Sequence, residues 1–175
     1  MTTKNETQNS INKNIYQKLL QLIPNLPEHL AQGKEYGKSQ SDGFMDLSYD
    51  FLHEDKKGEY IIALHHYFEM NGDLVPDPDM EIRVIPEKEI ANALSFQNQI
   101  IYQHVEEGTV HLQNDLNEFL EQWLDNALSQ AHKIDLSKER EELNHDDEME
   151  SEKEIELKNI RDNKERGEER FAQER

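Results

Sequence analysis

Cysteine is absent from the 175 residues of this chain. Its absence excludes disulfide bonds, thiolate nucleophiles and cysteine-ligated zinc sites, and it is consistent with the reducing environment of the cytoplasm. No apolar run approaches the ~18 residues that a membrane-spanning helix needs, and the first residues lack the hydrophobic core of a signal peptide. We therefore expect a soluble cytoplasmic protein with no membrane partner.

Basic residues are scarce. The chain has 19 Lys and Arg against 38 Asp and Glu, which gives a formal net charge of -19. Because binding to nucleic-acid phosphates or to an anionic membrane requires clustered positive charge, we expect no direct binding to either. An acidic surface instead attracts basic partners at low salt.

Motifs of known chemistry are also missing. The chain has no G-x-S-x-G turn for a nucleophilic serine and no glycine-rich loop for phosphates. Aromatic residues interleaved with Lys or Arg, as in single-strand binders, are not found either. We therefore predict no cofactor. The sequence favours a protein without catalytic activity, and it leaves an enzyme open.

Hydrophobic residues are unevenly distributed along the chain. Nearly all of them lie between Ile11 and Ile134, whereas the stretch from Ser137 to Arg175 is dominated by charged residues. This contrast predicts a flexible N-terminus over residues 1–9, a single domain over 10–135, and a charged extension over 136–175 that is partly helical or disordered.

The spacing of apolar residues within the domain predicts both helices and strands. A period near 3.6 indicates an N-terminal helix from Ser10 to Ile23 and a C-terminal helix from Leu112 to about His132. Alternation indicates strands over 44–51, 60–68 and 80–85, and two shorter strands between 90 and 105. The predicted fold is therefore α+β. An antiparallel sheet of four to five strands is packed by both helices on one face, and its other face is partly open.

Between the second and third predicted strands lies a segment rich in Asp and Pro. Asn71-Gly72 is typical of a turn, and the segment reads as a stiff, exposed acidic loop. We expect a protein-binding surface made of the carboxylates of this segment and the next carboxylate along the chain. These residues are Asp73, Asp77, Asp79 and Glu81.

Two adjacent histidines precede this segment. His65 and Glu69 would share one face of a strand, with His66 on the other, and an acid of the segment could fold back to complete a metal site. The spacing matches neither H-E-x-x-H nor a zinc finger or EF-hand. The alternative hypothesis is a metal-dependent hydrolytic enzyme centred on His65, His66 and Glu69.

The segment from His66 to Arg83 resembles a family of small bacterial, plasmid and phage proteins with the pattern H-Y-[FY]-E-x-N-G-D-L-x-x-D-P-[DE]-M-E-[IF]-R. The stretches 22–26, 90–97 and 112–124 resemble a related chromosomal family. Neither family has an assigned activity, so the resemblance implies no catalytic residue. It implies a bacterial cytoplasmic context, on the chromosome or on a mobile element.

Together these features favour a small acidic interaction or regulatory protein of a bacterium or its mobile element. We expect a protein partner. A basic component of nucleic-acid handling or host defence is one candidate, because its basic surface would match the acidic surface of this chain.

Overall fold

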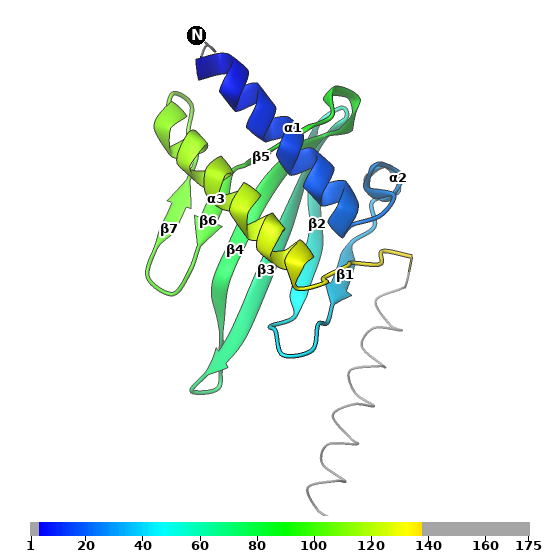
Figure 1. Ribbon diagram of the computed structural model, residues 1–175, viewed down its shortest axis with the longest axis vertical. Helices are drawn as coiled ribbons and strands as arrows, with labels where there is room; N and C mark the ends of the chain where they lie inside the picture. The colour runs from blue at the N-terminus through cyan, green and yellow to red at the C-terminus, as the bar shows by residue number, and fades with distance from the viewer. Residues whose placement is uncertain (1–3, 138–175) are drawn as a thin grey trace, which may run out of the picture. The chain divides into compact units, whose positions relative to one another are not determined.

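The computed structural model describes residues 4–137, which form an α+β domain (Figure 1). The predicted class is confirmed. The elements in chain order are α1 (Lys4–Leu22), α2 (Leu26–Ala31), β1 (Tyr36–Ser39), β2 (Leu47–Lys56), β3 (Glu59–Met70), β4 (Asp73–Ile85), a 3-10 turn (Pro86–Lys88), β5 (Ile90–Ala93), β6 (Ser95–Gln97), β7 (Tyr102–His104) and α3 (Val110–Ser129).

All strands belong to one antiparallel sheet, with the order β1-β2-β3-β4-β6-β7 and with β5 also paired to β4. The sheet has seven strands, so the predicted four to five was too few. Short β1 was missed, because four residues that include a glycine give little alternation to detect. The long hairpin of β3 and β4 forms the centre of the sheet.

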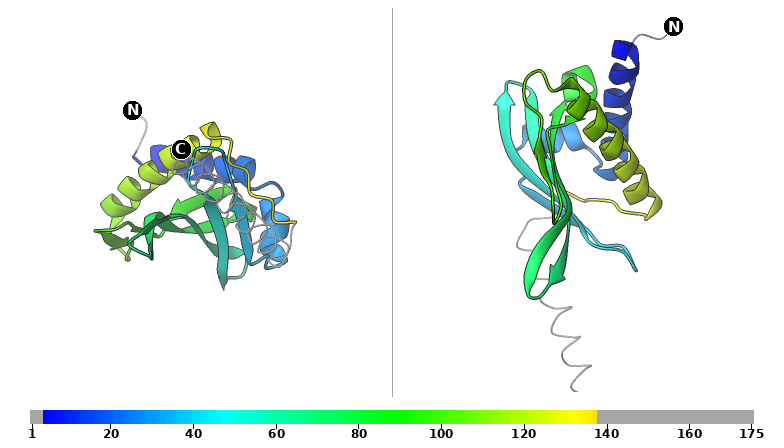
Figure 2. Two further views of the ribbon diagram at one scale, coloured as in Figure 1. Left: turned by 90° about the horizontal axis from the view of Figure 1, so that it is seen from below. Right: turned by 90° about the vertical axis from the view of Figure 1, so that its left-hand side faces the viewer.

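The two long helices cover the same face of the sheet, as predicted (Figure 2). They pack against each other, and both contact β5. Lys18 of α1 pairs with Asp125 of α3 at 2.7 Å and with Glu121 at 3.3 Å. Buried Asn117 joins α3 to the sheet, because its side-chain oxygen accepts the Ala93 N–H at 2.8 Å.

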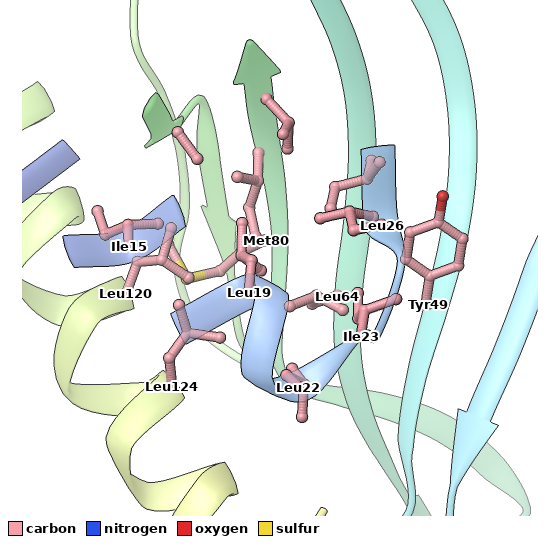
Figure 3. Close-up of a cluster of buried hydrophobic side chains, with 14 of the residues drawn as sticks. Ile15, Leu19, Leu22, Ile23, Leu26, Tyr49, Leu64, Met80, Leu120 and Leu124 are labelled. Carbon is pink, nitrogen blue, oxygen red and sulfur yellow. The ribbon is translucent and has the colours of Figure 1, made fainter. Parts of the chain in front are cut away.

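The core lies between these helices and the sheet (Figure 3). Alternate residues of β2, β3 and β4 point into it, and the apolar sides of α1 and α3 close it. Each fully buried Leu, Ile or Met contributes about 1.5–3 kcal/mol. The side chains with essentially no exposure include Leu19, Leu64, Met80, Ile82 and Leu120.

Several predicted boundaries are wrong. Helix α1 begins at Lys4 and not at Ser10, and α3 ends at Ser129, before the predicted His132. Within α3, apolar Phe119 is exposed, whereas polar Asn117 is buried. The expectation for the extension at 136–175 falls almost entirely outside the described residues.

Within the described residues, no helix is long and apolar enough to cross a membrane.

Candidate functional site

The β3–β4 hairpin runs past the strands on either side of it (Figure 1). The last pairing of β2 with β3 joins Leu47 to His66, and the pairing of β6 with β4 joins Gln97 to Asp79. Residues 67–78 therefore form a two-stranded extension whose outer edges have no strand partner in the described part of the chain. We call this extension the ribbon.

The prediction of an acidic loop is wrong, because residues 73–81 belong to strand β4, partly in the ribbon and partly in the main sheet. Only Asn71 and Gly72 form the turn, with φ of 57° and 88°. Both values are in the left-handed region that two-residue hairpins favour, and Asn and Gly adopt it most readily. Pro76 and Pro78 indicated a loop, but proline is tolerated where a strand edge has no partner.

The four predicted acidic residues do not form one cluster. Asp73 and Asp77 lie exposed on the ribbon. Asp79 and Glu81 lie half-buried in the main sheet, opposite His65 and Ala63, on the face that the helices leave open. The sequence therefore located the acidic region, and the structure divides it between the ribbon and the open face.

The two predicted histidines point to opposite faces of β3, as alternation requires. His65 lies on the open face, where its Nε2 is 2.8 Å from Asp50 Oδ2. His66 lies on the helix-covered face and is only 5% exposed. Glu69 lies exposed on the ribbon. The structure therefore does not bring His65, His66 and Glu69 together. No group of three or more His, Cys, Asp or Glu among residues 4–137 is placed to hold a metal ion.

The open face carries a small polar network beside His65. The Tyr67 hydroxyl donates a hydrogen bond of 2.7 Å to Asp79, and its ring meets that of His65 edge-on at 4.7 Å. Partial burial, reinforced by the Asp79 carboxylate, raises the pKa of Tyr67 to about 12. Tyr67 therefore stays protonated at neutral pH and acts as a hydrogen-bond donor.

A pocket of about 200 Å³ lies where the ribbon leaves the body of the domain. Four segments far apart in sequence converge on it: the loop before β2, the junctions of β3 and β4 with the ribbon, and the C-terminal end of α3. We call it the basal pocket, and it is lined by Phe44, Met45, His66, Asp77, Pro78, Trp123, Asn126 and Gln130.

His66 is held rigidly at this pocket. Its Nδ1 lies 2.8 Å from the backbone oxygen of Asp46, and its ring meets the Trp123 ring edge-on at 5.5 Å. Because a carbonyl oxygen only accepts hydrogen bonds, Nδ1 carries the hydrogen, and Nε2 of the neutral ring is left as an acceptor. The sequence could not reveal this pocket, because only the fold brings its segments together.

A second histidine lies behind the first. The rings of His66 and His132 are 5.7 Å apart, and His132 Nδ1 is 3.0 Å from the Ser39 hydroxyl. Burial lowers the pKa of both histidines, His65 further lowers the pKa of His66, and His66 further lowers the pKa of His132. Both rings are therefore neutral at pH 7.

The fold and the site define an acidic α+β domain with a projecting ribbon. A model of the family described as a domain of unknown function (DUF6908) matches residues 14–133, and the chain belongs to this family. The expected resemblance to an uncharacterised family is thereby confirmed. The search of curated proteins found no significant match, and the search of solved structures found none either.

Proposed function

We propose that this chain is a non-catalytic, acidic domain that binds a basic protein partner through the ribbon and the surface at its base. The observation that carries the proposal is the ribbon itself. Residues 67–78 extend beyond the sheet, where they add little to the core, and most of them present their side chains to solvent. A rigid projection of this kind can enter a groove of another protein.

Charge supports the choice of a basic partner. Between residues 67 and 81 there are five acidic residues and no Lys or Arg. Several basic residues of the body are already neutralised, since Lys18, Lys38 and Arg83 each pair with at least one carboxylate. The field around the ribbon is therefore negative, and it steers a basic surface toward the site at low salt.

The prolines favour recognition by side chains over backbone pairing. Pro76 and Pro78 have no N–H groups, so the outer edge of β4 offers few donors to an added strand. Exposed edges protected in this way resist non-specific pairing. We therefore propose that the carboxylates of Glu69, Asp73 and Asp77 make the main contacts.

The proposed setting is the cytoplasm of a bacterium, with the gene on the chromosome or on a plasmid or phage. The cysteine-free composition and the acidic surface support it. A basic nucleic-acid-handling or defence protein would present the matching charge. No direct contact with nucleic acid or membrane is proposed.

The test is a pull-down from bacterial lysate with the immobilised full chain. Wild type is compared with the double variant Glu69→Gln/Asp73→Asn, which removes two ribbon charges outside the basal pocket. We expect one basic partner to be recovered by wild type at about 50 mM NaCl and lost at about 500 mM, because salt screens exposed charges. The variant should recover much less of it.

The matched control is Glu106→Gln/Glu107→Gln. It removes the same charge from two exposed residues before α3, away from the ribbon. It should recover the partner as wild type does. Equal loss in both variants would mean that net charge alone drives binding, and failure to recover any partner at low salt would overturn the proposal.

A further inference from the structure

We infer that the basal pocket receives an arginine side chain of the protein partner. The inference rests on the proposed function and adds a specific contact to it, at a point where the ribbon, the loop before β2 and α3 meet.

The pocket has the size of a single side chain. Its volume of about 200 Å³ is below the range of about 300–1,000 Å³ that is usual for sites of drug-sized ligands. It opens beside the ribbon, because Asp77 and Pro78 form one of its walls. A partner bound along the ribbon therefore places its side chains at the opening.

The polar groups of the pocket match a guanidinium. Asp77 is its one formally charged residue, and no Lys or Arg is among the described residues that line it. His66 Nε2 is an acceptor, because Nδ1 donates to the Asp46 carbonyl oxygen. Asn126 and Gln130, whose side chains each carry an amide, also line the pocket. Arginine has five donors and no acceptor, so it can use several of these groups at once.

The apolar walls match the rest of the arginine side chain. Trp123 lines the pocket, and a guanidinium beside an indole ring gains a cation–π interaction. Phe44 is 51% exposed and Met45 is 40% exposed at the opening, although both are apolar. The methylene stem of an arginine would cover them. Lysine would match less well, because a compact ammonium group cannot reach several acceptors in one plane.

The test uses Trp123 as its reporter, because it is the only tryptophan of the chain. The full-length protein is titrated with acetyl-Gly-Arg-Gly-amide while the tryptophan emission is recorded. Peptides with citrulline or lysine in place of arginine, and free L-arginine, serve as comparisons. We expect a saturable change with the arginine peptide, weaker binding of the lysine peptide, and still weaker binding of the uncharged citrulline peptide.

Two single variants separate the pocket from the general charge of the ribbon. Asp77→Asn should weaken binding of the arginine peptide about two- to fivefold, which is the range for an exposed charge pair. Asp73→Asn removes the same charge from the ribbon outside the pocket lining and should leave the affinity within about twofold. Circular dichroism checks that both variants remain folded.

Three results would overturn the inference: no saturable change in emission, equal binding of arginine and citrulline peptides, or equal affinity of wild type and Asp77→Asn. Free L-arginine binding as tightly as the capped peptide would also overturn it, because the ligand would then be a small molecule. If the titration fails while the pull-down depends on the ribbon charges, only the pocket assignment is refuted. If the titration succeeds while the pull-down does not depend on those charges, the proposed role of the ribbon is refuted.

Discussion

The β3–β4 hairpin has two halves, one in the body of the sheet and one in the ribbon. They differ in strand pairing and in burial, although the same two strands run through both. In the body, residues 60–65 of β3 pair with β2 on one side and with β4 on the other, and β4 also pairs with β5 over residues 82–85 and with β6 at Asp79. Ile62, Leu64 and Met80 are fully buried. In the ribbon, β3 and β4 have no strand partner other than each other among residues 4–137, and Leu74 is 73% exposed.

This difference separates stability from recognition within one supersecondary unit. The body half is buried against the helices and anchors the hairpin, whereas the ribbon half buries little and is free to carry charge. A partner can therefore contact the ribbon without disturbing the core. Each prediction below tests how completely the two halves are separated.

The largest effect is expected from shortening a side chain in the body half. Leu64→Ala should lower the free energy of unfolding by about 2–5 kcal/mol, because it leaves a cavity beneath the helices. Leu74→Ala, which is the same change in the ribbon, should have an effect within about 0.5 kcal/mol. Urea unfolding followed by circular dichroism measures both. Similar losses would show that the ribbon contributes to the core and would contradict the separation.

An intermediate loss of stability is expected when the pH is lowered, because of His66 at the junction of the two halves and of His132 beside it. Burial lowers the pKa of His66 and of His132 below the ordinary value near 6.5, and nearby Asp46 only partly offsets this. The unfolded chain therefore binds more protons below that value. The stability that these histidines contribute is fully present above pH 6.5 and is lost as the pH falls from that value through their lower pKa in the folded protein.

Urea unfolding at about pH 7.5 and about pH 5.5 measures this loss. The variant His66→Gln/His132→Gln should show a smaller decrease over the same interval, because neither position titrates. An unchanged pH dependence in that variant would assign the acid sensitivity to other groups.

A smaller effect is expected when the ribbon is shortened. Replacing residues 69–74 by Asn-Gly joins Phe68 to Val75, which already face each other across the hairpin, through a two-residue turn. The free energy of unfolding should change by no more than about 1 kcal/mol. Recovery of the partner in the pull-down should be lost. Unfolding of the shortened protein would show that the ribbon cannot be separated from the body.

Much of the body could be predicted from the sequence. The alternation in Leu47, Tyr49, Ile82 and Val84 correctly predicted strands with one buried face, because strand periodicity depends on local spacing. By contrast, β1 could not be predicted. Its Gly37 is required because Ile134 and Leu136, almost a hundred residues later, cross directly over it, and a Cβ there would overlap both side chains.

The site was only partly predictable. The opposite orientation of His65 and His66 follows from strand alternation and is confirmed. Pro76 and Pro78 led to the wrong prediction of a loop, because proline is typical of loops and also of unpaired strand edges. The basal pocket was missed entirely. Its lining joins Met45, His66, Asp77 and Trp123, whose proximity depends on the packing of α3 on the sheet and leaves no trace in local spacing.

The smallest effect is expected at Tyr67, the first residue of the ribbon. Tyr67→Phe removes the hydrogen bond to Asp79, and because Tyr67 is 36% exposed, stability should fall by no more than about 1 kcal/mol. The bond is better observed through the tyrosine itself. In wild type, the ring ¹³Cζ resonance should report a pKa of about 12, because burial and Asp79 both disfavour the phenolate. Asp79→Asn should lower that pKa. An unchanged value would mean that burial and Asp50 set the pKa and that Asp79 does not tie the base of the ribbon to the open face.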